Sequence, residues 1–363
     1  MTPLGRHIAA LIASEGPISV ARYVALCLGD PRHGYYMTRD PFGAEGDFVT
    51  APEVSQMFGE LIGLWCADVW TRMGGPSPVR LVECGPGRGT LMADAVRAAK
   101  ALPPFRGALD VHLVETSPVL RDRQRTTLAT AGVPVTWHER LQTVPSGPAL
   151  VIANEFFDAL PIRQFVRTPD GWRERLVGLS PEGTLGFGLA PEPEPTLAGA
   201  QGASGAVLEI AEESAGVMRQ LAGRLAAQGG AALAIDYGHL RTAPGDTLQA
   251  VRRHRFVDPL AEPGEADLTA HVDFAALGRV AAQAGAAVHG PVTQGDFLRA
   301  LGLDARAAVL KRKVSPEGAT AIDAAVHRLA GGGEGMGELF KVIAVADPRL
   351  GPLPGFDSPA GTD

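Results

Sequence analysis

Cysteine is scarce in this chain of 363 residues, which contains only three. Cys27, Cys66 and Cys84 lie in apolar stretches, and no two of them have the C-x-x-C spacing of a metal or redox motif. A disulfide framework and a thiolate zinc site are therefore excluded as organising features. We expect reduced thiols in a hydrophobic core, as in a cytoplasmic protein.

An excess of basic charge is also missing. The net charge is -7 and the isoelectric point is about 5.8, whereas nucleic-acid surfaces are rich in lysine and arginine, so we expect no nucleic-acid partner. No apolar run is long enough to span a bilayer, so no membrane insertion is expected. The first residues resemble neither a secretory signal nor an arginine-rich transit peptide, which predicts a cytoplasmic location.

The most informative stretch present runs from Pro78 to Met92, with the sequence P-V-R-L-V-E-C-G-P-G-R-G-T-L-M. The mostly apolar run 79–82 predicts a buried strand, and Glu83 follows it. Three glycines then occupy alternate positions: Gly85, Gly87 and Gly89. A helix is expected directly afterwards, so the turn would bring bare backbone and helix N–H groups close to a ligand.

The spacing of the glycines distinguishes two nucleotide-like ligands. A dinucleotide fingerprint requires G-x-G-x-x-G, but the register that starts at Gly85 puts Thr90 at the third glycine position. The Glu83 carboxylate would repel a pyrophosphate and attract the ammonium and sulfonium groups of S-adenosylmethionine (SAM). We therefore favour SAM over a nicotinamide dinucleotide; a glycine-rich turn without a ligand is the simpler alternative.

Strand-like and helix-like segments alternate after the turn, which is typical of a mostly parallel α/β sheet. Further strands are expected over these ranges: 111–114, 135–138, 149–153, 231–235 and 340–345. Ligands of open α/β sheets bind at the carboxyl ends of the strands. An acid lies at or within two residues of the end of each expected strand except the last, which predicts an acidic site at that edge.

Two of these acids are candidates for binding the adenosine. Glu115 ends the second expected strand, near the place, about twenty residues after the glycines, where a ribose-binding acid is expected. Its two oxygens can accept hydrogen bonds from both ribose hydroxyls, and a plain surface acid is the alternative. Glu139 ends the next strand and is our candidate for the adenine amine.

The sequence N-E-F-F-D-A-L-P begins where the fourth expected strand stops. Asn154, Glu155 and Asp158 offer acceptors that could orient a nitrogen nucleophile, and a guanidinium would need such carboxylates to hold it and to remove a proton. Methyl transfer from a sulfonium is an in-line displacement, so no metal is expected. The alternative for Asn154 and Asp158 is that they cap a following helix.

About seventy-five residues precede the glycine turn and show helical periodicity. Helices are expected over 4–12 and 20–27, followed by a long loop over 32–50 that is typical of a functional lid. Thr50 and Glu53 are spaced as a capping box for one further helix.

A large insertion is expected between the fourth and fifth strands, from residue 162 to residue 228. It contains strand-like runs separated by turns at 169–171 and 181–183, and then a helix. Residues 239–270 lack periodicity, and their basic cluster is either a solvated loop or a substrate rim. The predicted division of the chain is a helical cap with its lid loop, a sheet domain and the insertion: 1–75, 76–161 with 229–363, and 162–228.

Six motifs together resemble the MidA-type family of SAM-dependent methyltransferases, which is related to the mitochondrial complex I assembly methyltransferase. They are G-D-F-V-T-A-P-E-V-S-Q-M-F-G-E (46–60), V-E-C-G-P-G-R-G-T-L-M-A-D (82–94), A-N-E-F-F-D-A-L-P (153–161), D-Y-G (236–238), A-D-L-T-A-H-V-D-F (266–274) and M-G-E-L-F-K-V (336–342).

The resemblance implies a class I methyltransferase, Rossmann-like α/β fold with SAM as methyl donor. It implies a protein substrate and, for the mitochondrial relatives, arginine methylation of a core subunit of NADH:ubiquinone oxidoreductase. We expect the loop that holds Gly46, Asp47 and Thr50 to close over the methyl donor. A non-catalytic assembly protein that retains a SAM pocket, or a methyltransferase for another substrate, stays open as an alternative, as does dimerisation.

Overall fold

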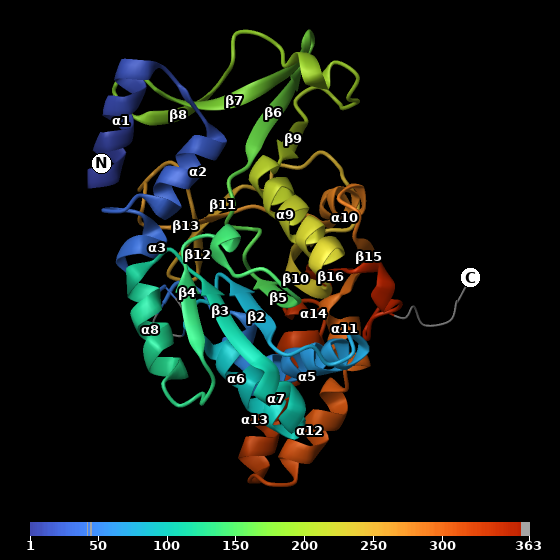
Figure 1. Cartoon of the computed structure of the whole chain (residues 1–363). Helices are drawn as coiled ribbons and strands as arrows, with labels where there is room; N and C mark the ends of the chain where they lie inside the picture. The colour runs from blue at the N-terminus through green and yellow to red at the C-terminus, as the bar shows by residue number, and fades with distance from the viewer. Residues whose placement is uncertain (42, 44–45, 357–363) are drawn as a thin grey trace. The chain divides into compact units, whose positions relative to one another are not determined.

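The structure, a computed structural model, describes residues 1–41, 43 and 46–356, which form two compact units (Figure 1). The unit that we call the meander unit comprises residues 1–48, 158–217 and 241–271. The unit that we call the sheet unit comprises residues 49–157, 218–240 and 272 onward. The predicted boundaries lay elsewhere: the N-terminal helices share a unit with the insertion, and residues 49–75 belong to the sheet unit.

The sheet unit is built on seven strands in the order β15-β16-β10-β5-β2-β3-β4, and a short strand β14 pairs with β10. The neighbours from β10 to β4 are parallel, whereas β16 is antiparallel to both β10 and β15. The strands are β2 (Val79–Cys84), β3 (Leu109–Val114), β4 (Val135–His138), β5 (Ala149–Asn154), β10 (Gly230–His239), β14 (Val272–Asp273), β15 (Ala287–Thr293) and β16 (Phe340–Ala346). The predicted α/β class is confirmed, and all six predicted strands are present; β15 was not predicted.

Helices cover both faces of this sheet. They are α4 (Ala51–Val54), α5 (Gln56–Arg72), α6 (Thr90–Ala98), α7 (Pro103–Ala108), α8 (Pro118–Leu128), the C-terminal part of α9 (Glu212–Gln228), α10 (Phe274–Gln283), α11 (Gln294–Ala300), α12 (Leu303–Lys311), α13 (Pro316–Ala330) and α14 (Met336–Leu339). Leu233 of β10 belongs to the hydrophobic cluster that contains α5. The other face meets α10, where a Cβ on Gly278 would lie 3.5 Å from the Cδ1 atom of Ile343. Two covered faces explain why these strands read as continuous apolar runs.

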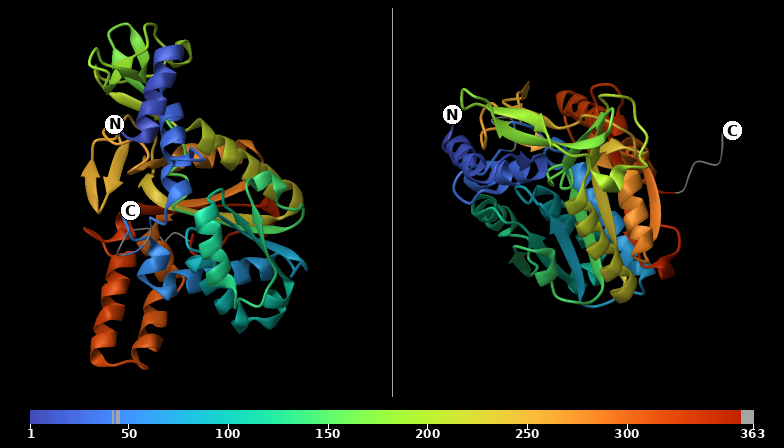
Figure 2. Two further views of the ribbon diagram at one scale, coloured as in Figure 1. Left: turned by 90° about the vertical axis from the view of Figure 1, so that its left-hand side faces the viewer. Right: turned by 90° about the horizontal axis from the view of Figure 1, so that it is seen from above.

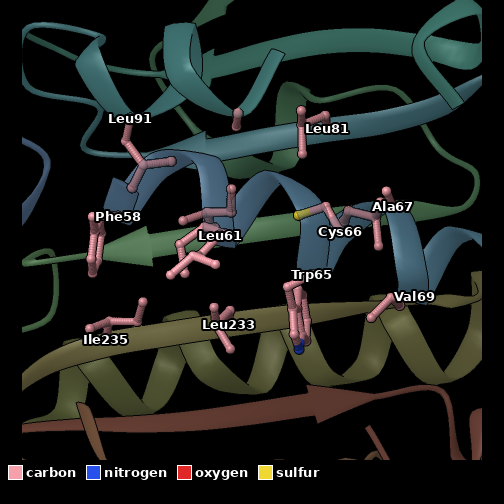
Figure 3. Packing of buried hydrophobic residues seen from close by; sticks show 14 of the residues in the cluster. Phe58, Leu61, Trp65, Cys66, Ala67, Val69, Leu81, Leu91, Leu233 and Ile235 are labelled. Carbon is pink, nitrogen blue, oxygen red and sulfur yellow. The ribbon is translucent and has the colours of Figure 1, made fainter. Parts of the chain in front are cut away.

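Helix α5 provides much of the core on one face of the sheet. Figure 3 shows Phe58, Leu61 and Trp65 of this helix directed toward Leu233 and Ile235 of β10. Burying side chains of this size stabilises the fold by roughly 1.5–3 kcal/mol each. Cys66 lies in the same cluster, and burial raises the pKa of its thiol, as expected for an unreactive core cysteine.

The capping box predicted ahead of this helix is wrong. The segment forms two helices, α4 and α5, which are separated by Ser55 in an extended conformation. Ser55 caps α5 by accepting a hydrogen bond from the Met57 N–H at 3.2 Å, whereas the side chain of Thr50 makes no cap hydrogen bond. Serine directly before a helix competes effectively for the cap position.

Helices α12 and α13 lie side by side as an antiparallel hairpin at the end of the sheet unit (Figure 2). The carboxylate of Glu60 on α5 binds Arg306 of α12 at 2.7 Å and Arg97 of α6 at 3.1 Å. These three helices are therefore joined by the ion pairs of one buried carboxylate with two partly exposed arginines, as well as by apolar packing.

The meander unit contains two predicted helices, α1 (Pro3–Glu15) and α2 (Val20–Gly29), followed by a short α3 (Tyr35–Thr38). The predicted turns join β6 (Arg163–Thr168), β7 (Gly171–Leu179) and β8 (Leu185–Leu189), and β1 (Ile18–Ser19) and β9 (Val207–Ile210) complete that sheet. Residues 239–270 were expected to lack regular structure, but they hold a second sheet of β11 (Gln249–Arg252), β12 (Arg255–Val257) and β13 (Asp267–Thr269). Arginine-rich strands hide the alternation on which such predictions depend.

No helix in the described part of the chain combines the length and apolarity that a bilayer crossing requires.

Gly63 tests the packing of α5 against α6. A Cβ on this residue would lie 2.6 Å from the Cα atom of Ala95, whereas Gly107 of α7 has open space around it. We expect Gly63→Ala to lower the free energy of unfolding by about 1–3 kcal/mol, because backbone atoms must move apart. Gly107→Ala is the matched control and should be neutral or stabilising by up to about 1 kcal/mol. Urea unfolding measures both, and equal effects of the two changes would contradict the close helix contact.

Candidate active site

The glycine turn after β2 has the backbone shape that its sequence predicts. Gly85, Gly87 and Gly89 have φ angles of 64°, 52° and 81°, which other residues rarely adopt. The Gly85 N–H donates to the carbonyl of Val114 at 3.0 Å and so ties the turn to the end of β3. Gly89 precedes α6 without a side-chain cap, and the N–H of Met92 in the first turn of that helix donates to Glu83.

Glu83 lies buried at the end of β2 and has an unusual electrostatic environment. The pKa of its carboxyl is raised to about 8, chiefly because the group is buried; a backbone hydrogen bond from Met92 lowers this pKa, and the nearby Glu115 charge raises it. Its Oε2 atom is buried without a hydrogen-bond partner. A buried acceptor of this kind fits a ligand that brings a positive charge.

Glu115 follows β3 at the same edge of the sheet. Its Oε1 accepts a hydrogen bond from the Ser117 N–H at 2.8 Å, and its Oε2 accepts one from Gln124 at 3.2 Å. Burial raises the pKa of this carboxyl, and the two hydrogen bonds lower it. The carboxylate is held in place by protein donors while it lies beside the glycine turn, as a ribose acceptor must be.

Glu139, the candidate for the adenine amine, lies at the end of the neighbouring strand β4. Its side chain is 75% exposed, and its Oε1 lies 3.8 Å from Arg121. The Arg121 side chain also donates to the carbonyl of Glu115 at 2.8 Å. The structure therefore places Glu139 near Glu115 through a shared arginine, in a more exposed position.

Asn154 and Glu155 occupy the end of β5, the strand on the other side of β2. The Glu155 Oε1 accepts hydrogen bonds from Asn154 Nδ2 at 3.1 Å and from the Ala51 N–H at 3.2 Å. Glu155 has a φ of 49°, a strained conformation for a residue with a side chain. The Oδ1 of Asn154 is buried without a hydrogen-bond partner. Strain and an unpaired acceptor at one strand end are typical of a functional site.

The helix-capping alternative for Asn154 and Asp158 is wrong, because turns and bends, not a helix, follow β5. The turn is held instead by Asp236 of β10, whose carboxylate accepts a hydrogen bond from the Phe157 N–H at 3.0 Å. The sequence shows Asp236 only as part of the D-Y-G motif, because its role depends on pairing between strands far apart in sequence.

Glu53 has a different role from the predicted cap. Its Oε1 accepts a hydrogen bond from the Thr90 hydroxyl at 2.5 Å, and its Oε2 lies 3.7 Å from Arg88. Glu53 therefore joins α4 to the glycine turn and to the start of α6. The sequence offers no local signal for this contact, because the partners lie 37 residues apart.

Three predicted site residues belong to the meander unit. Gly46 donates to the carbonyl of Gly43, while Phe42, Ala44 and Glu45 of the expected lid loop lie outside the described residues. The Asp47 carboxylate accepts hydrogen bonds from the Tyr35 hydroxyl and the Arg253 N–H, both at 2.6 Å. Within the described residues of its own unit, Asp47 thus organises the turn between β11 and β12.

Asp158 is the third predicted site residue in the meander unit. The pKa of Tyr36 is raised, first because the side chain is buried and then because of the charges of Asp267 and Asp158. The Tyr36 hydroxyl donates to Asp267 at 2.8 Å. Tyr35, Tyr36 and Asp267 were not predicted as site residues. Their clustering requires residues 35–36 and 267 to meet, which sequence spacing does not show.

The chain matches known proteins over most of its length. Residues 61–292 match the model of a family described as putative S-adenosyl-L-methionine-dependent methyltransferase. "Protein arginine methyltransferase NDUFAF7, mitochondrial" from Mus musculus is 40% identical over 370 residues, which covers 95% of this chain and 84% of that protein. The protein of the same name from Danio rerio is 40% identical over 336 residues and covers 86% of this chain and 79% of its own length.

A solved structure is also similar. It is described as a COG1565 superfamily member and likely methyl transferase from Burkholderia thailandensis, bound to S-adenosyl-homocysteine. It matches with a TM-score of 0.85 and 30% identity, over 98% of this chain and 94% of that one.

These matches confirm the predicted class I methyltransferase fold and the choice of SAM over a dinucleotide. They contradict the predicted cytoplasmic location, because the relatives are named as mitochondrial proteins. The inference from the first residues of the chain was wrong.

The raised pKa of Glu83 predicts a pH-dependent stability. The folded carboxyl titrates near pH 8 and an ordinary one near 4.5, so the folded chain binds more protons between these values and loses stability as pH rises through them. We expect Glu83→Gln to stabilise the protein by about 2–4 kcal/mol at pH 8.5, and by less than about 1 kcal/mol at pH 5. Urea unfolding at both pH values measures this, and a difference that is independent of pH would contradict the buried, protonated carboxyl.

The glycine turn can be tested with a pair of glycines. Val at position 87 would be strained at a φ of 52°, and we expect Gly87→Val to weaken binding of S-adenosylhomocysteine at least about 100-fold. Gly183, in the turn between β7 and β8, has a φ of 78° and open space around it. Gly183→Val should strain the backbone similarly and leave the affinity unchanged. Calorimetry that finds wild-type binding by Gly87→Val would refute the turn as the cofactor site.

Proposed function

Because this chain belongs to the family of putative S-adenosyl-L-methionine-dependent methyltransferases, we propose that it methylates the guanidinium nitrogens of arginine side chains in a protein substrate. The name of the curated relatives, protein arginine methyltransferase, supports this choice of substrate. The observation that carries it here is the pair of acceptors at the end of β5, Asn154 and Glu155, beside the glycine turn.

The register of the sheet supports this pairing of sites. Glu83 of β2 lies opposite Ile152 of the parallel strand β5, so the turn after β2 and the acceptors after β5 leave the sheet at the same edge. Glu83, Glu115 and the turn glycines would hold the cofactor there, with Glu139 near the adenine. The unpaired Oε2 of Glu83 fits its ammonium or sulfonium charge.

The cofactor supplies a methyl group bound to a positively charged sulfur, and this sulfur is the leaving group, as a neutral thioether, when a nitrogen attacks the methyl carbon. The chain's own task is to place that nitrogen in line and to accept the proton that it loses. Glu155 is suited to this task, because Asn154 and the Ala51 N–H fix one of its carboxylate oxygens. A planar guanidinium donates through a fork that two acceptors can orient.

Asp158 belongs to the same motif as Asn154 and Glu155, N-E-F-F-D-A-L-P, and we include it in the proposed substrate-orienting set for this reason. Within the meander unit, the Tyr36 hydroxyl donates to Asp267 at 2.8 Å, and the charges of Asp267 and Asp158 add to the effect of burial in raising the pKa of that hydroxyl. Gly46, Asp47 and Thr50 are proposed to lie on the cofactor side, as their motif suggests.

The first substrate to test is a core subunit of respiratory complex I. The resemblance of six sequence motifs to the complex I assembly methyltransferase supports this choice. Intact mass spectrometry of complex I subunits, with and without the gene, measures gain or loss of about 14 or about 28 mass units, the increments for one or two methyl groups. If the masses of the complex I subunits are the same with and without the gene, this substrate is rejected and the enzyme class still stands.

Glu155→Gln tests the role of the carboxylate directly. Loss of the proton acceptor should lower kcat by about 100-fold or more, while affinity for S-adenosylhomocysteine stays within about threefold. The readout is radiolabelled methyl transfer to protein from cells that lack the gene, followed by methylarginine analysis. Glu317→Gln, an exposed residue of α13, is the control and should be fully active. Normal turnover by Glu155→Gln would refute the proposed role.

A further inference from the structure

Gln124 of α8 is a fully buried glutamine whose side chain meets three parts of the candidate site. Its Nε2 donates to the carbonyl of Gly87 at 2.8 Å and to the Oε2 of Glu115 at 3.2 Å. Its Oε1 accepts a hydrogen bond from the Trp137 indole N–H of β4 at 2.9 Å. One amide therefore links the glycine turn, the acid after β3 and the strand beyond it.

The chemistry of the partners fixes the orientation of this amide. A backbone carbonyl and a carboxylate only accept hydrogen bonds, and an indole N–H only donates. The amide nitrogen must therefore face Gly87 and Glu115, and its oxygen must face Trp137. Both N–H donors and the carbonyl are used, so a flipped amide would lose all three hydrogen bonds.

Packing holds α8 against the turn at the same place. A Cβ on Gly89 would lie 3.4 Å from the Cγ and 3.5 Å from the Cα of Gln124. These are ordinary van der Waals distances, so α8 packs directly against the turn, and it is the positive φ of Gly89 that favours glycine there. The amide reaches the turn from a helix backbone that is itself fixed in position.

We propose that Gln124 is a positioning residue for the cofactor, which sets the distance between the Glu115 carboxylate and the glycine turn so that both engage one nucleoside. This proposal rests on the SAM-binding role of Glu115 and the turn in the proposed function. A residue of this role acts through its neighbours: its loss frees Glu115 to rotate and so weakens recognition of the ribose more than recognition of the rest of the ligand.

Gln294 provides a matched control. It is also fully buried in the sheet unit, and its Nε2 donates to the carbonyl of Leu329 at 2.8 Å. Its contact lies between α11 and α13, away from the glycine turn. Replacing either glutamine by methionine keeps the side-chain length and removes the hydrogen bonds.

The test is calorimetry of the full chain with S-adenosylhomocysteine and with its 2′-deoxyribose analogue. We expect Gln124→Met to raise the Kd for S-adenosylhomocysteine about tenfold. The wild type should lose about tenfold in affinity on removal of the 2′-hydroxyl, and Gln124→Met should lose less than about threefold. Gln294→Met should bind both ligands as tightly as the wild type. Gln124→Glu places a carboxylate against two hydrogen-bond acceptors, so its affinity for S-adenosylhomocysteine should fall about 100-fold. In turnover, Gln124→Met should raise the KM for SAM and leave kcat within about twofold.

Each outcome bears on the proposal. If the wild type binds S-adenosylhomocysteine and Gln124→Met shows the same penalty for the missing hydroxyl, Gln124 is only structural and the proposal is wrong. If the wild type binds neither ligand, the cofactor site of the proposed function fails as well. If Gln124→Met does not fold, Trp137→Phe takes its place, because it removes only the indole donor. A Kd for S-adenosylhomocysteine that rises about threefold, with a smaller loss of affinity on removal of the 2′-hydroxyl than in the wild type, supports the proposal. Unchanged binding refutes it.

Discussion

The parallel pairing of β2 with β3 on one side and with β5 on the other is the constraint on which the site depends. Glu83 lies opposite both Leu113 and Ile152, so three successive strand ends reach the same edge in register. The glycine turn, Glu115 and the Asn154–Glu155 pair then become neighbours, although almost seventy residues separate the first from the last. A slip of one residue in either pairing would turn these side chains to the opposite face.

This edge carries polar groups that the protein leaves incompletely satisfied. The Oε2 of Glu83 and the Oδ1 of Asn154 are buried acceptors without hydrogen-bond partners, and such groups cost about 1–3 kcal/mol each. Glu155 adds backbone strain at the same edge. The apolar faces of the sheet, packed by α5 and α10, supply the stability that offsets these groups.

The parts of this protein that could be predicted from its sequence are those that depend on local pattern. The strand–turn–helix over Pro78 to Met92, the acids at strand ends and the hairpins of the insertion follow from apolar runs and glycine positions. Contacts between distant segments could not be predicted, because no local sequence pattern marks either of the two residues that meet. Glu53 with Thr90 and Gln124 with Gly87 are of this kind, each pair 37 residues apart. The arginines of residues 239–270 were assigned to a loop because their charge concealed a small sheet.

The division of the chain into interleaved segments has a consequence for how the protein is made. The meander unit is assembled from residues 1–48, 158–217 and 241–271, and β10 of the sheet unit pairs with β16, more than a hundred residues later. A chain that emerges from the ribosome N-terminus first cannot finish either unit early, since the first needs residue 271 and the second needs residue 346. Apolar α1 and α2 must therefore wait for their partners during synthesis, and contacts of this range fold slowly. The apolar residues of α1, such as Leu4 and Ile8, therefore stay exposed on the nascent chain until the segment that contains Leu268 has been synthesised.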